Sequence, residues 1–374
     1  MIGIDVFRRQ IKNVLYNCLC GNLIRKVNLV KNKTCSLRKS ATVSVAPMMD
    51  WTDRHCRYLH RKISKKILLY TEMLTASAVI NGDESKLLAY DDCEHPVALQ
   101  LGGSEPKLLA KAVKIGEKWN YDEVNLNIGC PSDRVKSGSF GVVLMRTPEL
   151  VSDCVKAMLD VSESAEITIK CRIGVDDDDP YKTLPEFIEK MHLAGVTRLT
   201  IHARKAWLQG ISPKQNRNLP PLDYQLIYKI KKMFPNLHIT INGGIKNNVE
   251  IKKHLESGMD GVMIGRAAYH NPMLVLRSID SEIFEHDYKK NRFEIVNEML
   301  PYIDRHIENG GKLNQVSRHM LGIFSGQPGA KIWRQEISKY AHKKNAGSKI
   351  LIEACKRVLM LQQEIKDVDP LNKG

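Results

Sequence analysis

Short apolar runs and longer amphipathic segments alternate along the chain from residue 43 to residue 264. The apolar runs have the usual length of strands, and most of the segments between them are long enough for a helix. We predict strands at residues 43–46, 67–73, 96–101, 121–127, 167–172, 196–202, 238–241 and 261–264. Helical patterns lie between them at residues 54–61, 105–118, 149–161, 184–193, 224–233 and 249–257. This alternation favours parallel strands joined by helical crossovers.

Eight such strands predict a (β/α)₈ TIM barrel over residues 41–285. An open doubly wound sheet is the alternative, but no GxGxxG motif follows the first predicted strand. Beyond the barrel, residues 293–307, 313–321, 330–342 and 348–365 have helical patterns. The expected fold is therefore α/β: a barrel followed by a small C-terminal α-helical bundle at residues 290–370.

Residues 1–40 differ from the rest of the chain. They carry nine Lys or Arg residues and one acid, Asp5, and part of them has amphipathic helical spacing. This basic N-terminal extension is consistent with a transit peptide, a disordered extension, an arm that contacts RNA or a start codon assigned too early. We expect a cytoplasmic location, with a mitochondrion or plastid as the alternative if the extension is a transit peptide.

Composition narrows the class of protein. The net charge of +15 indicates a polyanionic partner, although excess lysine is often only a solvated surface. The nine cysteines form no CxxC pair, which argues against structural zinc and a disulfide scaffold and predicts no metal. No apolar run reaches the roughly 18–20 residues of a membrane span. The oligomeric state is open, and a monomer is the simplest expectation.

A cysteine at the end of the fourth predicted strand is the first candidate for chemistry. Cys130 lies in a Gly-Cys-Pro turn, where Gly129 permits a sharp bend and Pro131 fixes the backbone. A thiol at the carboxyl end of a barrel strand is a candidate acid or nucleophile. The alternative is that Cys130 is simply packed, since cysteine is often buried.

The other strand ends also carry polar side chains or glycines. The loops after strands seven and eight of a barrel often hold a phosphate. Here they contain Asn242-Gly243-Gly244 and Gly265-Arg266. Gln100, Lys170 and His202 are predicted to face the same mouth, so we expect a ligand larger than phosphate. A glutamine amide matches the pyrimidine edge of a flavin, and a lysine can offset the charge of a reduced flavin.

Several sequence blocks resemble the tRNA-dihydrouridine synthases. They are residues 46–53, 125–131, 170–172, 202–204, 242–244 and 265–267. Residues 53–57, 129–135, 205–208, 218–224, 317–322 and 326–330 are similar to the A subfamily in particular. The resemblance implies an FMN-dependent enzyme that reduces uridine in the tRNA D loop, at positions 20 and 20a, to 5,6-dihydrouridine with NADPH as the electron source.

The resemblance also assigns roles to individual residues. It places the flavin contacts at Pro47, Met48, Met49, Gln100, Lys170, His202, Asn242, Gly243, Gly244, Gly265 and Arg266. It makes Cys130 the proton donor and puts Asn127 against the target nucleotide. An ordinary thiol, with a pKa of about 8.5, is mostly protonated at neutral pH and can donate. One departure is Val143, where the family commonly has a second, non-catalytic cysteine; we expect only a packing difference there.

Basic side chains outside these motifs are candidates for contact with tRNA. They are Lys205, Arg217, Arg318, Lys331 and Arg334, each of which could instead be an ordinary solvated side chain. Trp333 and Met320 are expected to be core. Three other classes remain as alternatives: a flavin oxidoreductase of the dihydroorotate dehydrogenase type, a non-catalytic tRNA-binding protein and a Schiff-base aldolase. The aldolase would leave Cys130 without a role.

Overall fold

The computed structural model describes residues 35–132, 138 and 140–368. Most of the basic extension lies outside this range, as does the Asp133-Arg134-Val135 part of one family motif. Residues 35–40 are helical, and Leu37 is buried in a cluster with Leu68, Tyr70 and Met263.

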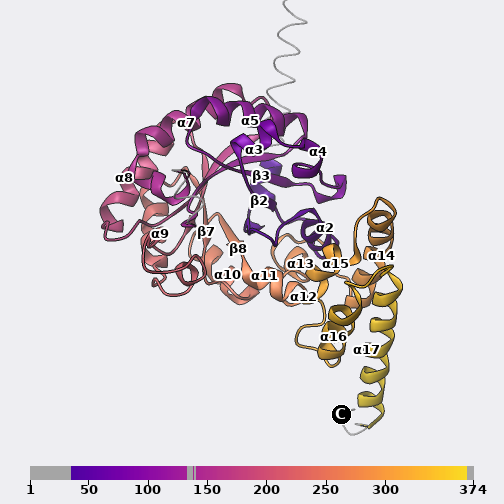
Figure 1. Cartoon of the computed structure of the whole chain (residues 1–374). Coiled ribbons are helices and arrows are strands. Elements are labelled where there is room, and N and C mark those ends of the chain that lie inside the picture. Colours follow the sequence, from indigo (N-terminus) through magenta and orange to yellow (C-terminus); the bar gives the residue numbers. More distant parts are fainter. Residues whose placement is uncertain (1–34, 133–137, 139, 369–374) are drawn as a thin grey trace, which may run out of the picture.

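Eight parallel strands form the centre of the molecule (Figure 1). They are β1 (Val43–Val45), β2 (Leu69–Thr75), β3 (Val97–Gly102), β4 (Glu123–Ile128), β5 (Glu166–Arg172), β6 (Arg198–His202), β7 (His238–Asn242) and β8 (Gly261–Ile264). Hydrogen bonding follows the order β1-β8-β7-β6-β5-β4-β3-β2. A parallel bridge between Ser44 and Leu68 joins the first strand to the second, so the sheet closes on itself. The predicted barrel is confirmed.

Helices follow the strands and surround the barrel. They are α2 (Arg54–Ile63), α3 (Ala76–Asn81), α4 (Glu84–Leu87), α5 (Pro106–Lys118), α7 (Pro148–Val161), α8 (Pro180–Leu193), α9 (Tyr224–Met233) and α10 (Asn248–Glu256), with 3₁₀ turns at Asp92–Glu94, Gly141–Arg146 and Gln215–Arg217. In α5, the buried residues Leu109, Ala112, Val113 and Gly116 recur at helical spacing, which turns one face towards the strands. The short elements α3 and α4 were not predicted, because a turn or two of helix has too little periodicity to detect.

The strands separate apolar from polar side chains. On β4, Val124, Leu126 and Ile128 belong to the main hydrophobic core, whereas Glu123 and Asn125 bond to side chains of other strands inside the barrel. This alternation follows from the two-residue period of a strand. The part of the barrel interior beside β4 is therefore polar, although these side chains are buried.

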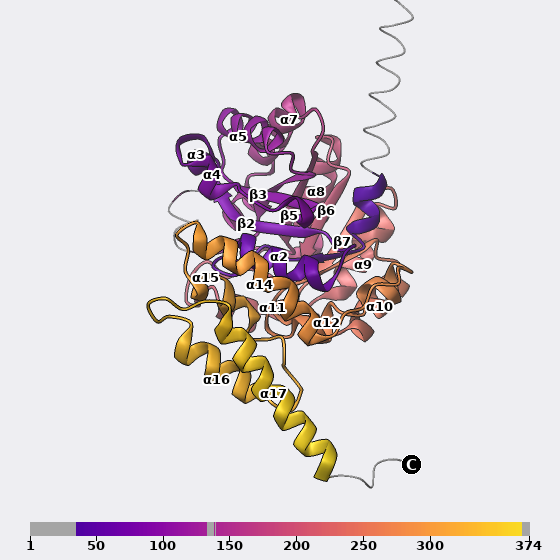
Figure 2. The ribbon, with the colours of Figure 1, turned by 90° about the vertical axis from the view of Figure 1, so that its right-hand side faces the viewer.

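Short helices lead from the barrel into the C-terminal helical region. After α11 (Arg266–His270), α12 (Pro272–Val275) and α13 (Ile279–Ile283) come α14 (Arg292–Glu308), α15 (Leu313–Ser317), a 3₁₀ turn (Arg318–Met320), α16 (Ala330–Tyr340) and α17 (Lys349–Val368). Figure 2 shows α16 and α17 side by side. Trp333 and Met320 are fully buried, as expected. Among the helices of the described residues, none combines the length and the apolar composition of a membrane-spanning segment.

The helical region docks against α2 of the barrel. Tyr302 of α14 stacks on Tyr58 at 3.9 Å between ring centroids, and its hydroxyl lies 2.7 Å from Nδ1 of His55. Asp53, which caps α2, lies 2.6 Å from Nη2 of Arg318 and 3.0 Å from Nε2 of His319. Aromatic packing and one ion-pair cluster therefore hold the two regions together.

Candidate active site at the carboxyl ends of the strands

Two adjoining cavities of about 690 and 400 Å³ lie at the carboxyl ends of the barrel strands. They share several lining residues, among them Pro47, Met48 and Lys170. The residues predicted for the flavin and the thiol chemistry all line one or both cavities: Pro47, Met48, Met49, Gln100, Asn127, Cys130, Lys170, His202, Asn242, Gly243, Gly244, Gly265 and Arg266. The folded barrel thus brings residues of five strands, β3 to β7, and of the loops after β1, β4, β7 and β8 into one space.

The turn that carries Cys130 is fixed by backbone and side-chain contacts. The amide N–H groups of Gly129 and Cys130 both donate to Oδ1 of Asn127, at 3.0 and 2.9 Å. Arg172 donates through Nε to the carbonyl of Gly129 at 2.9 Å. The half-buried thiol lies 3.4 Å from Oγ of Ser132 and lines the smaller cavity. These contacts hold the thiol at the cavity wall.

Arg172 also ties this turn to the loop after β6. Its Nη1 donates to the carbonyl groups of Lys205 and Asn216, at 3.0 and 3.1 Å. The guanidinium is almost fully buried, and burial lowers the pKa of Arg172 to about 10. The sequence indicates Arg172 only as part of a motif, because nothing in it shows that the carbonyl partners of Arg172 lie on two different loops.

Positive charge is concentrated on one side of the cavity. Lys170 lines both cavities, and burial together with the charge of Arg172 lowers its pKa to about 8. Burial, with the charges of Arg172 and Lys170, lowers the pKa of His202 well below its usual value. His202 is therefore a neutral imidazole at neutral pH, able to donate from one ring nitrogen and accept at the other.

The turn after β7 requires glycine at positions 243 and 244. Gly243 and Gly244 have φ angles of 114° and 75°, which glycine adopts without strain. A Cβ at Gly243 would lie 2.8 Å from Cδ2 of His202, and one at Gly244 would lie 2.5 Å from Cδ1 of Leu222. Arg266, across the same cavity, donates to Oδ1 of Asn218 at 2.7 Å. Close backbone approach and a guanidinium are suited to an anionic group such as a phosphate.

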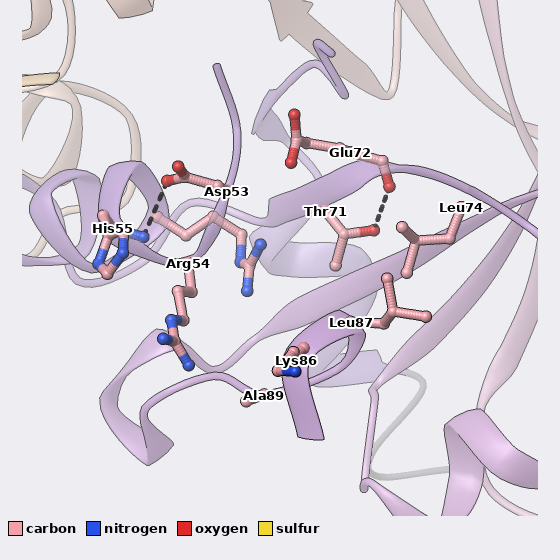
Figure 3. A pocket seen from close by; sticks show the side chains of 10 residues that line it. Asp53, Arg54, His55, Thr71, Glu72, Leu74, Lys86, Leu87 and Ala89 are labelled. Carbon is pink, nitrogen blue, oxygen red and sulfur yellow. Dashed lines mark hydrogen bonds between the residues drawn. The ribbon is translucent and has the colours of Figure 1, made fainter. Parts of the chain in front are cut away.

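A smaller pocket of about 190 Å³ lies beside the mouth, between the start of α2 and β2 (Figure 3). Asp53 and His55 lie across it from Thr71 and Glu72, and Lys86 stands at its edge. Burial, with the charge of Asp53, raises the pKa of Glu72 above its usual value. No sequence motif indicates this pocket, since its lining comes from three elements, α2, β2 and α4.

The basic residues predicted to contact tRNA are spread over the surface. Arg217 lines both cavities, and Nζ of Lys205 lies 5.7 Å from the ring centroid of the partly exposed Trp207. Arg318 is paired with Asp53. Lys331 and Arg334 are exposed on α16. The structure thus places Arg217 in the candidate site and the other four outside the cavity lining.

The described residues contain no cluster of His, Cys, Asp or Glu that could hold a metal ion. Their cysteines are all free thiols, Cys130 included. In (β/α)₈ enzymes, side chains gathered at the carboxyl ends of the strands carry the reaction. The fold and this cavity therefore define an enzyme of the (β/α)₈-barrel class.

Comparison with known proteins identifies the family. The family model described as dihydrouridine synthase (Dus) matches residues 44–360. A tRNA-dihydrouridine(20/20a) synthase of Vibrio vulnificus (strain CMCP6) is 52% identical over 322 residues, covering 85% of this chain and 97% of that protein. The protein of the same name from Escherichia coli (strain K12) is 51% identical over 337 residues, covering 90% and 96%. This chain belongs to the dihydrouridine synthase family.

Similarity to solved structures is more distant. A 2-naphthoyl-CoA reductase complex aligns with a TM-score of 0.48 and 10% identity, covering 65% of this chain and 50% of that one. The old yellow enzyme from Trypanosoma cruzi aligns with a TM-score of 0.46 and 12% identity, covering 68% and 91%. Similarity of this extent does not bear on function.

Proposed function

We propose that this protein is a tRNA-dihydrouridine synthase, which reduces the C5=C6 bond of a D-loop uridine to 5,6-dihydrouridine. The family match over residues 44–360 carries the proposal. Relatives about half identical in sequence are named tRNA-dihydrouridine(20/20a) synthases, so we propose positions 20 and 20a as the targets. The location of Cys130 and Lys170 on one cavity supports the same reaction.

We propose FMN as the cofactor, with NADPH as the reductant. The two cavities fall within the range of about 300–1,000 Å³ typical of cofactor sites. The lining fits the parts of FMN: Gln100 suits the pyrimidine edge, Lys170 a negative charge on the ring, and Arg266 with the Gly243-Gly244 turn the phosphate. The other proposed contacts are Pro47, Met48, Met49, His202, Asn242 and Gly265. When bound and reduced, FMN supplies the hydride.

The residues of the chain provide the proton and the geometry. Cys130 donates a proton to C5 of the uracil while C6 receives the hydride, so that the C5=C6 double bond becomes a single bond and two C–H bonds form. Asn127 fixes the turn that carries the thiol through the two backbone N–H groups it accepts from. The carboxamide of Asn127 also lies on the cavity wall, where we propose that it contacts the target nucleotide.

We propose that tRNA binds across the mouth of the barrel and the helical region. The target base must leave its stack to reach the cavity, and RNA recognition favours such unstacked nucleotides. Arg217 lies at the cavity itself, and Lys205 lies beside the exposed Trp207, on which a base could stack. We propose phosphate contacts for Lys331 and Arg334 on α16 and for Arg318. We expect the protein to act as a cytoplasmic monomer.

Mass spectrometry of nucleosides from unmodified tRNA treated with the purified protein, FMN and NADPH tests the activity. We expect a gain of two hydrogens on uridine, mapped to positions 20 and 20a of the D loop. Tight tRNA binding and bound FMN without dihydrouridine would instead support a non-catalytic tRNA-binding protein.

A further inference from the structure

A continuous series of hydrogen-bonded, buried polar side chains runs along the inside of the barrel to the Cys130 turn. Its members are Glu123, Thr168, Asn125, Gln100 and Asn127, and we call this series the file. At its lower part, Thr168 donates to Glu123, and Nδ2 of Asn125 donates to Oγ1 of Thr168 at 2.8 Å. Nε2 of Gln100 donates to Oδ1 of Asn125 at 2.8 Å, and Nδ2 of Asn127 donates to Oε1 of Gln100 at 2.8 Å. All five side chains are at least 90% buried, so water does not compete for these hydrogen bonds.

The file starts from a carboxylate that can only accept hydrogen bonds. Arg198 lies 2.5 Å from Oε2 of Glu123 and 2.9 Å from Oε2 of Glu166, and Tyr70 donates to Oε1 of Glu123 at 2.7 Å. Although burial alone would lower the pKa of Arg198, the charges of Glu123 and Glu166 raise it above its usual value. The guanidinium thus stays charged, and Arg198, Tyr70 and Thr168 all donate to the two oxygens of Glu123.

This fixed end determines the direction of every hydrogen bond above it. Because Glu123 only accepts, the Thr168 hydroxyl must donate to it, which leaves a lone pair that receives the amide NH₂ of Asn125. The oxygen of Asn125 then faces the NH₂ of Gln100, and the oxygen of Gln100 faces the NH₂ of Asn127. The upper end is fixed independently, since Oδ1 of Asn127 receives the backbone N–H groups of Gly129 and Cys130.

Gln100 therefore reaches the cavity with a defined orientation. One hydrogen of its NH₂ and one lone pair of its oxygen are used in the file, which leaves one donor and one acceptor for a ligand. A flipped amide would exchange the positions of donor and acceptor and would oppose the NH₂ groups of Gln100 and Asn127. Asn125 and Thr168, which line neither cavity, oppose that flip from below, as Asn127 does from above.

We propose that Asn125 and Thr168 are positioning residues that, together with Asn127 above them, hold the amide of Gln100 in one orientation towards the flavin. This inference rests on the proposed function. It assigns a role in the reaction to two side chains that contact neither substrate nor cofactor. The file holds the free donor and the free acceptor of Gln100 in fixed positions. Gln100 therefore selects a ligand whose edge has the matching acceptor and donor, as the pyrimidine edge of a flavin does.

A matched pair of substitutions tests the proposal. Thr168→Val removes the hydroxyl inside the file. Thr200→Val makes the same change at an equally buried residue of β6 that forms no side-chain hydrogen bond within the described part of the chain. Asn125→Leu breaks the file one step nearer Gln100. The dissociation constant for FMN is read from the fluorescence released when the holoenzyme is diluted, and kcat and KM are measured with unmodified tRNA.

We expect Asn125→Leu to weaken FMN binding about tenfold and Thr168→Val about threefold, which corresponds to the usual cost of one buried hydrogen bond. Both should lower kcat while leaving KM for tRNA nearly unchanged, because the amide of Gln100 that faces the flavin is no longer held from below, whereas the RNA surface is intact. Thr200→Val should leave FMN binding and kcat within about twofold of the parent, since it removes no partner of the file.

Three outcomes would overturn the proposal. One is an unchanged FMN dissociation constant in folded Thr168→Val and Asn125→Leu proteins. Another is an equal loss in Thr168→Val and Thr200→Val, which would indicate a general packing effect. The last is a parent protein that binds no FMN, which would also remove the proposed function. If the parent binds FMN and forms dihydrouridine while the variants are unaffected, the positioning role fails and the proposed function stands.

Discussion

Glu123 inside the barrel and Asp53 at the start of α2 each contact an arginine, but in different surroundings. The side chain of Glu123 has no exposed surface, and Arg198, its partner, is 2% exposed. The side chain of Asp53 is 20% exposed, and its partner Arg318 is 47% exposed. A buried pair is costly to break because the remaining charge has no water, whereas an exposed pair can be replaced by solvent. The Glu123–Arg198 pair thus holds the lower end of the hydrogen-bonded file inside the barrel, and the Asp53–Arg318 pair joins the barrel to the helical region.

The barrel interior around Glu123 and the interface around Asp53 also differ in which other contacts depend on the ion pair. Above Glu123, hydrogen bonds continue through Asn125 and Gln100 to the turn that carries Cys130. Around Asp53, the contacts end at the interface, where aromatic stacking of Tyr58 on Tyr302 supplies apolar packing. Disturbance inside the barrel should therefore reach the chemistry, and disturbance at the interface should chiefly affect docking of the helical region.

The largest effect is expected at the upper end of the internal file. Cys130→Ala should lower dihydrouridine formation by about 10²–10⁴-fold, the usual contribution of a general acid, and should leave FMN bound. Nucleoside mass spectrometry and the visible spectrum of the holoenzyme measure the two quantities. Undiminished turnover in this variant would remove Cys130 from the mechanism.

At the lower end, Arg198→Met should decrease the free energy of unfolding by about 3–5 kcal/mol, because two buried carboxylates lose their cation. Urea denaturation measures this change. Arg38→Met is the matched control, since Arg38 lies 3.5 Å from the same Glu166 but is 37% exposed and should cost less than about 1 kcal/mol. Similar losses in both variants would contradict the distinction between the buried and the exposed pair.

At the interface, Asp53→Asn should cost about 1 kcal/mol, because it removes the charge facing Arg318 and His319 but keeps a side chain that caps α2. Asp83→Asn is the control: it has the same chemistry at the cap of α4, where Asp83 pairs with the exposed Lys86, and should cause no measurable change. A loss of unfolding free energy as large as that of Arg198→Met would show that an ion pair at the interface is as costly to break as one in the barrel interior.

The smallest effect is a pH dependence at the same residue. Although burial alone would raise it, hydrogen bonds and the charge of His319 hold the pKa of Asp53 well below its usual value. The folded state therefore binds fewer protons than the unfolded state below the unfolded pKa of about 3.9. The stability difference between the parent and Asp53→Asn should be complete above about pH 5 and should shrink as the pH falls below about 4. Urea denaturation at pH 6, 4 and 3 measures it; a difference that grew at low pH would give the opposite sign.

Much of the fold was predictable because it depends on local sequence patterns, namely apolar runs and turn residues. All eight strands were predicted within two residues of their observed ends, since each is an apolar run between polar segments. The Gly-Cys-Pro turn and the glycine pairs were found for a similar reason, because their backbone demands depend on the residue type itself. The site residues that the family resemblance implied all line the cavity, although their roles stay proposals.

The tertiary structure decided which polar side chains meet. Glu123, Asn125, Thr168 and Arg198 stand at alternate positions of three strands, where the sequence gives no sign that they form a single file. Arg318 stays a candidate for contact with tRNA, but only the fold shows that it lies beside Asp53, 265 residues earlier. The sequence determines strand periods, turns and the reactive thiol, because these depend on neighbours along the chain. Partners across a barrel depend on register and closure, which exist only once the strands have paired.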